Sequence, residues 1–389
     1  MERLVTSDLK LGIIAGGQLG KMLIQEASKW DIITYVLDKD ETCPAGSIAS
    51  HFMKGSNTDF DAVYNFGKMV DVLTFEIENV NIEALKKLKA EGLRIVPDPE
   101  ILEMIQDKGL QKDFYQKNHI PSPSFSVYKT TDEILKAVDN NEIGFPFVQK
   151  LRKGGYDGRG VAVIADKSGL PKLLEGTSVI EEMVDIAKEI SVIAARNHKG
   201  EIRCYPVVEM IFDPHANLVD KLICPSSVTV EQSEKATGIA AEIIELLNME
   251  GLLAVELFVN TKGEVLVNEI APRPHNSGHH TIESVITSQF EQHLRAILNL
   301  PLGSTKIKMP SVMINLLGEE GYEGAVKYLG LTESMAIDGV KIHLYGKKVT
   351  KPYRKMGHVT VLSSSLECAM KKSERVKKLI SVTSWNKSQ

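Results

Sequence analysis

A glycine-rich segment with basic neighbours is the part of the sequence that most directly indicates chemistry. Lys150 ends a short apolar run, and four glycines lie between residues 154 and 160. Glycine lets a backbone approach a ligand closely and direct its N–H groups at anionic oxygens, and Arg152, Lys153 and Arg159 add positive charge. The segment lacks the Gly-Lys-Ser/Thr ending of a Walker A loop. It predicts a different kind of polyphosphate site, and the alternative is a surface hairpin without a ligand.

Two glutamates in an expected β-hairpin form a second candidate site. Residues 254–270 read as two strands joined by a short turn. A two-residue turn would place Glu256 directly opposite Glu269, on one face of the hairpin. The same register pairs Phe258 with Val267. A slipped register, with one glutamate pointing to solvent, is the alternative.

Such a pair of carboxylates needs a compensating charge. At about 5 Å and an effective dielectric of 20, the repulsion is roughly 3 kcal/mol, which is large for a marginally stable protein. A shared proton would relieve it, but Mg²⁺ binds carboxylate oxygens together with nucleotide phosphates. We therefore predict a Mg²⁺ site, with Mn²⁺ as an alternative ion, formed by Glu256, Glu269 and the neutral oxygen of Asn268.

The elements before residue 110 predict a domain that positions one part of such a site. Apolar runs alternate with helical segments such as residues 82–90, and the runs lie at residues 10–14, 32–37, 70–75 and 93–96. This alternation is typical of a parallel sheet covered by helices. We expect a Rossmann-like, doubly wound α/β domain over residues 1–109.

Two further domains follow. Prolines near residue 121 interrupt helical continuation, and strands and helices then arrive in mixed order, which predicts an α+β domain over residues 110–303. Residues 304–389 are expected to form a small β-rich domain, with strands at residues 311–316, 340–345 and 358–362. Its basic tail, residues 371–378, is read as the solvated face of a helix.

The composition excludes several classes of function. Hydrophobic residues make up 43% and charged residues 25% of the chain, and no apolar run approaches the roughly 20 residues that a bilayer requires. The first residues lack the core of a signal peptide, which predicts a cytoplasmic protein. The net charge of −5 argues against nucleic-acid binding. The four cysteines form no Cys-x-x-Cys pair and are expected to be buried free thiols.

Several motifs resemble the ATP-grasp superfamily and, within it, the 5-(carboxyamino)imidazole ribonucleotide synthase family. The most specific are Gly-Gly-Tyr-Asp-Gly-Arg-Gly at residues 154–160 and Ala-Pro-Arg-Pro-His-Asn-Ser-Gly-His at residues 271–279. Supporting matches lie at residues 16–22, 74–80 and 354–358. The resemblance implies an ATP-grasp enzyme with a pre-ATP-grasp domain, a central ATP-grasp domain and a C-terminal domain. It also implies a homodimer.

The reaction implied by the resemblance is a step of de novo purine biosynthesis. ATP and bicarbonate would carboxylate 5-aminoimidazole ribonucleotide through carboxyphosphate, releasing ADP and phosphate. The resemblance assigns nucleotide contacts to Lys108, Lys150, Gly155, Tyr156, Asp157, Gly158, Arg159, Gly160, Val161, Glu181, Glu182, Met183, Val184, Glu189, Asn268 and Glu269. It assigns ribonucleotide contacts to Gln18, Glu76, Tyr156, Asp157, Arg273, His275, Asn276, Ser277, Lys347 and Arg354.

Three of these residues are expected to act in catalysis: Lys150, Asp157 and Arg273. A guanidinium group can brace the charge that grows on a transferring phosphoryl group without donating a proton. A structural salt bridge is the alternative role for Arg273.

Three positions depart from the family pattern. Ala15 replaces a glycine at the first turn, which a small residue tolerates if φ stays negative. Phe212 stands where a nucleotide-contacting histidine is common, and His215 cannot be assumed to replace it. Tyr353 stands where a glycine usually precedes Arg354.

Other functions remain open at this point. The first strand-turn-helix, with Asp38 after it, is an alternative dinucleotide site of a dehydrogenase, although Ala15 interrupts the glycine pattern. Another ATP-grasp ligase would keep the two glutamates but lack the run at residues 273–279. A catalytically inactive nucleotide-binding module is the third alternative. A zinc site formed by the histidines of residues 275–280 is disfavoured, because Pro272, Pro274 and Gly278 break the helix that would align them.

Overall fold

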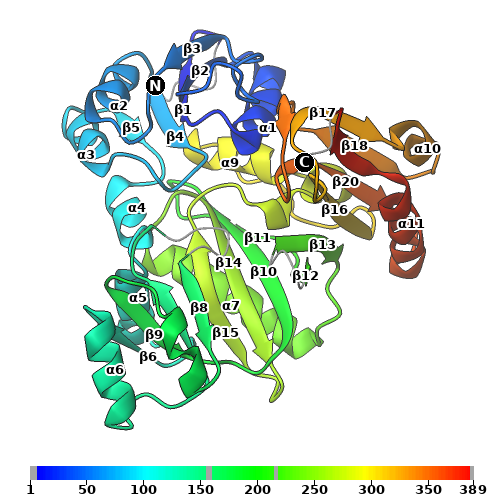
Figure 1. Ribbon diagram of the computed structural model, residues 1–389. Helices are drawn as coiled ribbons and strands as arrows, with labels where there is room; N and C mark the ends of the chain where they lie inside the picture. Colours follow the sequence, from blue (N-terminus) through cyan, green and yellow to red (C-terminus); the bar gives the residue numbers. More distant parts are fainter. Residues whose placement is uncertain (1–6, 155–159, 214–217, 386–389) are drawn as a thin grey trace.

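The computed structural model describes residues 7–154, 160–213 and 218–385 (Figure 1). Its first part is a five-stranded parallel sheet with the strand order β3-β2-β1-β4-β5. The strands are β1 (Lys10–Ile14), β2 (Ile33–Asp38), β3 (His51–Lys54), β4 (Val72–Phe75) and β5 (Arg94–Ile95). This order confirms the expected doubly wound sheet, whereas the short, half-exposed edge strand β3 was not predicted.

Helices cover both faces of this sheet. They are α1 (Gln18–Ala27), α2 (Phe60–Gly67) and α3 (Ile82–Ala90). Leu11 and Ile13 of β1 pack in the core beneath α1, and Ile14 packs in the core beneath α2 and α3. The short helix η1 (Ser28–Trp30) follows α1. A buried strand with apolar residues on both faces is what a parallel sheet requires.

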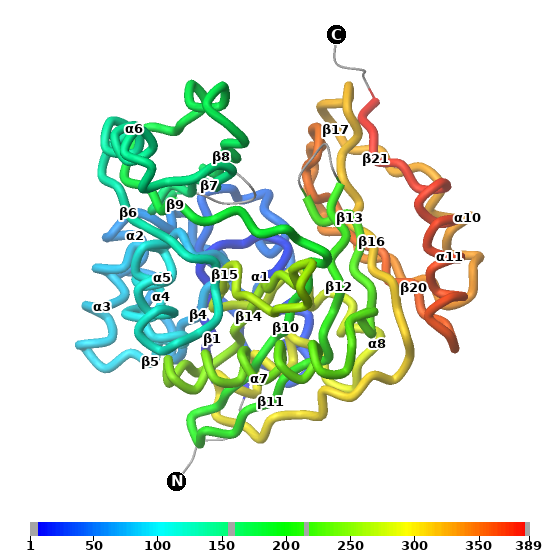
Figure 2. Tube along the Cα trace, turned by 90° about the horizontal axis from the view of Figure 1, so that it is seen from below, coloured from blue at the N-terminus to red at the C-terminus, as the bar shows by residue number. Residues whose placement is uncertain are grey.

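A small antiparallel sheet forms a separate lobe (Figure 2). Its order is β6-β9-β7-β8, from β6 (Phe125–Tyr128), β9 (Ser178–Glu182), β7 (Phe147–Leu151) and β8 (Val161–Ile164). Helices α4 (Pro99–Ile105) and α5 (Lys108–Lys117) precede the lobe, and α6 (Thr131–Asp139) and η2 (Lys167–Lys172) belong to it. The lobe presents Lys150 of β7 and Glu181 of β9 to the rest of the chain.

A nine-stranded sheet spans the middle and the end of the chain. Its path is β15-β14-β10-β12-β13-β16-β20-β18, with β11 beside β10. The strands are β10 (Ile186–Arg196), β11 (Ile202–Cys204), β12 (Val208–Asp213), β13 (Leu218–Cys224), β14 (Gly251–Asn260), β15 (Val265–Ala271), β16 (Ser311–Leu317), β18 (Val340–Leu344) and β20 (Lys355–Leu362). The antiparallel pairing of β13 with β16 joins the central strands to the C-terminal strands.

Helices on the two sides of this sheet connect it to the rest of the molecule. Helix α7 (Val230–Leu246) packs on β10 and β14. Helix α9 (Gln289–Ile297) contributes Phe290 and Leu294 to the core that surrounds α1, so it ties the sheet to the first domain (Figure 1). Between β15 and α9 lie η3 (Asn276–Gly278) and α8 (Thr281–Ser284).

The C-terminal part confirms the expected β-rich segments at residues 311–316, 340–345 and 358–362. It adds a three-stranded sheet of β17 (Gly324–Leu329), β19 (Val349–Thr350) and β21 (Ser381–Ser384), and the helices α10 (Leu331–Met335) and α11 (Leu366–Leu379). Helix α11 buries Ala369 and Val376, while its lysines face solvent as expected.

The cysteines differ in part from the expectation of buried thiols. Cys43 and Cys224 are buried and Cys204 is half-buried, but Cys368 is exposed on the polar side of α11. Its place in the basic stretch decides its exposure, because that face of the amphipathic helix points to water.

Among the described residues, no helix combines the length and the apolar character needed to cross a membrane.

Candidate active site

The hairpin of β14 and β15 brings the two predicted glutamates opposite each other. Glu256 pairs with Glu269, as predicted, but the predicted pairing of Phe258 with Val267 is wrong, since Phe258 pairs with Leu266. Three residues, 261–263, form the turn in place of two, and Gly263 takes the left-handed conformation that such loops need. This longer turn shifts the register by one residue.

A β-bulge at Asn268 restores the register before the glutamates. The pairing passes from Leu257–Val267 to Glu256–Glu269 and leaves Asn268 without a cross-strand partner. A bulge bends the strand and re-aims its side chains. The freed Asn268 side chain accepts a hydrogen bond from Nζ of Lys150 through Oδ1 at 2.9 Å.

The carboxylate pair has the electrostatics of a cation site. The Glu256 side chain is only 16% exposed. Burial, together with the charges of Glu269 and Glu189, raises its pKa to about 8. Within the described parts of the chain, no group of three His, Cys, Asp or Glu side chains converges as a metal site. The residues present therefore fit a divalent cation that takes its remaining ligands from Asn268, water or phosphate oxygens.

Lysines from the lobe and from α5 lie on the Glu269 side of this pair. Nζ of Lys108 lies 3.3 Å from Oε2 of Glu269. Nζ of Lys150 lies 3.0 Å from Oε2 of Glu181, and the other oxygen of Glu181 lies 3.1 Å from Nζ of Lys112. These five residues border one small cavity, which is also lined by Gln111, Tyr115 and Asn268. The cavity is thus lined by both ammonium groups and carboxylates, a combination suited to polyphosphate with a cation.

The structure describes only the two ends of the glycine-rich loop. Gly160 precedes β8, and Val161, the first residue of β8, pairs with Lys150 of the neighbouring β7. The other predicted loop contacts, Gly155, Tyr156, Asp157, Gly158 and Arg159, lie outside the described residues.

The residues predicted to border adenine and ribose lie along β9 and β10. Glu182 accepts a hydrogen bond from Ser124 at 2.6 Å, while Met183 is exposed and Val184 is half-buried. Glu189 of β10 is half-buried, and burial raises its pKa to about 7. Its charge acts on Glu256, so the structure places the predicted ribose contact near the carboxylate pair.

The chain after β15 extends this site toward the first domain. Nε2 of His275 lies 3.4 Å from Oε1 of Glu256. Burial lowers the pKa of His275 well below its usual range, so the ring is neutral and the contact is no ion pair. Nδ1 of His275 lies 2.9 Å from Oγ of Ser277, and Asn276 donates to Oδ1 of Asn315 at 2.9 Å. The predicted His-Asn-Ser run is therefore held in place by partners from β16 and by its own turn.

Arg273 reaches the first domain directly. Its Nη2 lies 2.7 Å from Oε1 of Glu78, and Nη1 donates to the carbonyl of Pro274 at 3.0 Å. The salt bridge considered as the alternative for Arg273 is thus present. It also fixes the guanidinium group where the domains meet, so the two roles are compatible.

Glu76 occupies the crevice of the parallel sheet. Adjacent strands β1 and β4 lead into opposite crossovers at this point, and ligands of doubly wound sheets bind at the carboxyl ends of such strands. The carboxylate of Glu76 accepts backbone hydrogen bonds from Gly17 and from Gly20 of α1, the latter at 2.5 Å. A Cβ atom at Gly17 would collide with this carboxylate. Burial raises the pKa of Glu76, and the helix amides oppose that shift.

This contact disfavours the dinucleotide alternative. A pyrophosphate would need the N-terminal amides of α1, which already bind the Glu76 carboxylate. Asp38 is engaged as well, since it accepts a hydrogen bond from the Gly16 backbone at 2.7 Å. The loop after β1 is therefore closed by side chains of its own domain.

The remaining predicted ribonucleotide contacts are Gln18 of the first domain and two cations of the C-terminal part. Gln18 begins α1 and is half-buried. Lys347 donates to the carbonyl of Lys355 at 2.7 Å, and its charge acts on Glu76. Arg354 donates to the carbonyl of Val349 at 2.6 Å. The charge of Arg354 acts on Asp40, which follows β2 in the first domain.

Known proteins are similar in sequence to this chain along most of its length. Family models match it in succession: a ribonucleotide synthetase preATP-grasp domain at residues 9–106, an ATP-grasp domain at residues 113–290, and a phosphoribosylaminoimidazole carboxylase C-terminal domain at residues 311–372. The N5-carboxyaminoimidazole ribonucleotide synthase of Bacillus subtilis is 38% identical over 356 residues, covering 90% of this chain and 91% of that protein. The chain belongs to the N5-carboxyaminoimidazole ribonucleotide synthase family.

Solved structures of synthase-family proteins have the same fold. The Thermotoga maritima N5-carboxyaminoimidazole ribonucleotide synthetase is 47% identical, with a TM-score of 0.89, and the match covers 97% of this chain and 99% of that one. The Aspergillus clavatus enzyme, in complex with ADP and 5-aminoimidazole ribonucleotide, is 30% identical, with a TM-score of 0.86 and coverage of 96% and 99%. The chain spans 65% of the chloroplastic phosphoribosylaminoimidazole carboxylase of Vigna aconitifolia. It is an ATP-grasp ligase by family.

The structure explains two departures from the synthase-family pattern. Ala15 has a φ of 71° and Tyr353 a φ of 62°. The condition under which alanine would be tolerated at this position, a negative φ, is therefore not met. Both positions take the left-handed conformation, which glycine adopts without strain. Phe212 packs with Val219 and Met210 in an apolar cluster, so its side chain supplies no polar group there. His215 lies outside the described residues.

Sequence reasoning missed some residues that hold the synthase-family site together. Glu78 anchors Arg273, and Asn315 holds Asn276. Lys21 donates to the carbonyls of Leu344 and Tyr345, joining α1 to the C-terminal part. Glu78 and Lys21 do lie within recognised motifs. Lys112 and Asn315 lie outside them, and their spacing carries no indication of a site.

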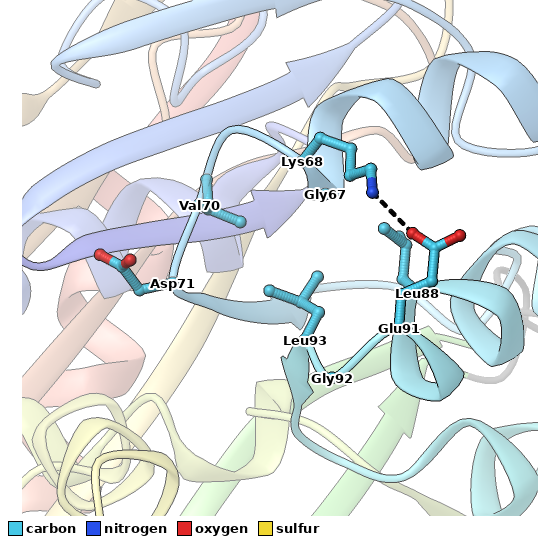
Figure 3. Close-up of a pocket in the computed structure, with 8 residues that line it drawn as sticks. All are labelled: Gly67, Lys68, Val70, Asp71, Leu88, Glu91, Gly92 and Leu93. Atoms are coloured by element: carbon cyan, nitrogen blue, oxygen red, sulfur yellow. Dashed lines mark hydrogen bonds and ion pairs between the residues drawn. The ribbon is translucent and has the colours of Figure 1, made fainter.

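A further hollow lies in the first domain, away from these residues. Figure 3 shows it between Gly67, Leu88 and Leu93, with the ion pair of Lys68 and Glu91 at 2.6 Å on its rim. It lies near the amino ends of β4 and β5. Ligands of doubly wound sheets bind at the opposite, carboxyl ends, where Glu76 is placed.

Proposed function

We propose that this chain uses ATP and bicarbonate to carboxylate 5-aminoimidazole ribonucleotide to N5-carboxyaminoimidazole ribonucleotide in de novo purine biosynthesis. The observation that carries the proposal is a series of neighbouring groups. Glu269 pairs with Glu256, His275 lies 3.4 Å from Glu256, and the charge of Arg273 acts both on His275 and on Glu76 in the crevice. The series leads from a predicted cation and phosphate site to a crevice bordered by cations. Family membership and the ADP and ribonucleotide bound to the Aspergillus relative support the same assignment.

The nucleotide half of the site is proposed to bind ATP with Mg²⁺, or with Mn²⁺. Glu256, Glu269 and Asn268 would hold the cation, which when bound neutralises charge on the phosphates. Lys108 and Lys150 already border the cavity and would contact phosphate oxygens. Two sets of contacts rest on the family resemblance. Glu181, Glu182, Met183, Val184 and Glu189 would line the adenosine, and Gly155, Tyr156, Asp157, Gly158, Arg159, Gly160 and Val161 would cover the phosphates.

In the acceptor half, Arg273 is proposed to stabilise the carboxyphosphate. Glu78 holds one edge of its guanidinium group, so the group is oriented before substrate binds. Arg273, held this way, favours the charge that develops during phosphoryl and carboxyl transfer. Gln18, Glu76, Tyr156, Asp157, His275, Asn276 and Ser277 would bind the ribonucleotide, with Lys347 and Arg354 at its phosphate.

The neutral His275 is available to accept or share a proton at Nε2. Its Nδ1 lies beside Ser277, and Ser277 in turn lies 2.9 Å from Ser191 of β10. This pair of hydroxyl contacts orients the ring. Glu256 is then the nearest carboxylate of the described site to Nε2.

ADP formation tests the proposal. The wild-type chain is assayed with ATP, Mg²⁺ and bicarbonate, with and without 5-aminoimidazole ribonucleotide, beside Glu269→Gln. Glu264→Gln, in the same hairpin but exposed, is the matched control. We expect ribonucleotide-dependent ADP release in the wild type and in the control, and its loss in Glu269→Gln.

The other outcomes identify the alternatives. Ribonucleotide-independent turnover with a different acceptor would indicate another ATP-grasp ligase. Nucleotide binding without ADP release would indicate an inactive nucleotide-binding module. Either result contradicts the proposed reaction.

We further propose that the chain is a cytoplasmic homodimer that binds neither nucleic acid nor a membrane. The dimer rests on the family resemblance, and the net charge of −5 supports the absence of nucleic-acid binding. Sedimentation equilibrium of the purified chain measures the mass, and a monomer at micromolar concentration would contradict the dimer.

A further inference from the structure

A buried lysine beside the nucleotide site has no role in the reaction described so far. Lys112 lies on α5 and is 3% exposed. Its Nζ lies 3.1 Å from Oε1 of Glu181, and among the described residues it makes no hydrogen bond of good geometry. A methionine would fill similar space without burying a charge, and replacing buried ion pairs by apolar side chains is often neutral or stabilising. The buried charge therefore calls for a functional reason.

The partner of Lys112 is shared with a residue of the proposed phosphate site. Oε2 of Glu181 lies 3.0 Å from Nζ of Lys150, whose ammonium group also donates to Asn268 at 2.9 Å. Glu181 is thus one carboxylate between two ammonium groups. Only Lys150 of the two also contacts the bulged residue beside the cation ligands. The three residues come from α5, β7 and β9, so the arrangement links the lobe to the start of α5.

The charges of this group depend on each other. Burial opposes ionisation of Glu181, but Lys150 and Lys112 together lower its pKa below the usual range. Burial lowers the pKa of Lys112 to about 8, and Glu181 opposes that shift. Both groups therefore remain charged at neutral pH. If Lys150 left Glu181 without Lys112 present, a buried carboxylate would lose its remaining counter-ion, which is costly in a protein interior.

We propose that Lys112 is a positioning residue that keeps Glu181 paired, so that Lys150 can turn its ammonium group from Glu181 to a phosphate of the bound nucleotide. The inference rests on the nucleotide site of the proposed function. Lys108 would make a similar exchange. It is paired with Glu269, and a cation bound by Glu269 would release Lys108 to contact the phosphates. Lys112 has no such exchange, because its burial keeps it on Glu181.

Calorimetric titration with ADP and Mg²⁺ tests this role without requiring turnover. We expect Lys112→Met to weaken ADP binding about tenfold, within the range for a buried contact with a charged group. Lys117→Met is the matched control, since it removes an exposed lysine from the same helix, and it should bind ADP as the wild type does.

A double-mutant cycle separates positioning from a merely structural role. With Glu181→Gln in place there is no carboxylate to neutralise, so adding Lys112→Met should no longer weaken ADP binding. The double variant also removes both buried charges at once, which keeps the comparison possible if Lys112→Met alone folds poorly. Additive losses in the cycle, or a folded Lys112→Met that binds ADP like the wild type, would overturn the proposal.

The outcomes for the reaction and for Lys112 are distinguishable. A wild type that binds ADP but does not carboxylate the ribonucleotide contradicts the proposed function and leaves the Lys112 cycle fully measurable. A wild type that carboxylates the ribonucleotide, together with an unaffected Lys112→Met, contradicts only the role of Lys112.

Discussion

Glu256 and Glu269 lie directly opposite each other because the bulge at Asn268 cancels the register shift of a three-residue turn. Without the bulge, Glu256 would pair with Asn268, and Glu269 would move one position along its strand. The hairpin is thus built to bring two repelling carboxylates together, which is unfavourable for folding and useful for binding a cation. The chain carries an electrostatic cost that its ligand would relieve.

Replacing Glu256 with Gln should therefore stabilise the protein and abolish its activity. In the absence of divalent cations and at pH 7 we expect the free energy of unfolding to rise by about 2 kcal/mol, because glutamine removes the cost of folding the Glu256 carboxyl into a site that raises its pKa to about 8. Urea unfolding in EDTA measures the change, and Mg²⁺-dependent ADP formation should be lost. Glu242→Gln, exposed on α7, should change neither quantity. A destabilised Glu256→Gln would contradict the idea that the pair is strained.

Ala15→Gly should stabilise the protein. A Cβ atom in the left-handed conformation costs roughly 1 to 2 kcal/mol, and glycine removes that cost. Glycine also raises the conformational entropy of the unfolded chain, which offsets part of the gain, so we expect the free energy of unfolding to rise by about 0.5 to 1 kcal/mol. The same substitution at Ala27, where φ is −59°, should destabilise the protein instead. Urea unfolding of the two variants gives the comparison, and equal signs would refute the strain at Ala15.

Arg354→Ala should act on the ribonucleotide and leave ATP unaffected. We expect the KM for 5-aminoimidazole ribonucleotide to rise by about tenfold or more, with a smaller change in kcat, because a contact to a remote phosphate acts mainly through binding. Steady-state kinetics with each substrate varied separately measures the effect. Lys351→Ala, an exposed charge of the same segment, is the control. A change confined to the KM for ATP would place Arg354 at the nucleotide.

Acid should destabilise the protein through its buried histidines. Burial lowers the pKa of His280 and of His293 to about 3, whereas an unfolded histidine titrates near 6.5. Between these values the unfolded chain binds more protons, so this stability is complete above pH 6.5 and is lost as the pH falls toward 3. Each residue contributes up to about 1.4 kcal/mol per pH unit.

Urea unfolding between pH 7 and pH 5 tests the prediction. In His293→Gln the slope of stability against pH should fall by the contribution of one histidine. Identical slopes in the wild type and His293→Gln would show that His293 does not titrate in this way.

Much of the fold follows from local pattern, and less of the site does. The strands of the parallel sheet are buried on both faces and read as continuous apolar runs, so β1, β2 and β4 could be predicted. The edge strand β3 could not, because its half-exposed residues carry no such pattern. The glutamate pairing was predicted correctly although the turn length was wrong, since the bulge compensated for the error. Bulges depend on tertiary context and leave little trace in a sequence.

The parts of the site that sequence reasoning missed depend on long-range contacts. Arg273 meets Glu78 across nearly 200 residues, and Lys112 meets Glu181 from a different element. Residue type and spacing alone do not indicate which distant carboxylate a cation will reach. The sign of φ at Ala15 was likewise inaccessible, because the reversal of the chain after β1 follows from the packing of α1 on the sheet.

The pairing of β13 with β16 has a practical consequence for dissecting the protein. If the chain were cut between β13 and β16 and the first part were expressed alone, four consecutive residue pairings from Lys221 to Cys224 would be lost. Strand β13 would then be an exposed edge strand. Exposed edge strands pair with strands of other chains and promote aggregation. A shortened central segment expressed alone should therefore be insoluble, and supplying the C-terminal segment in trans should recover soluble material by strand complementation.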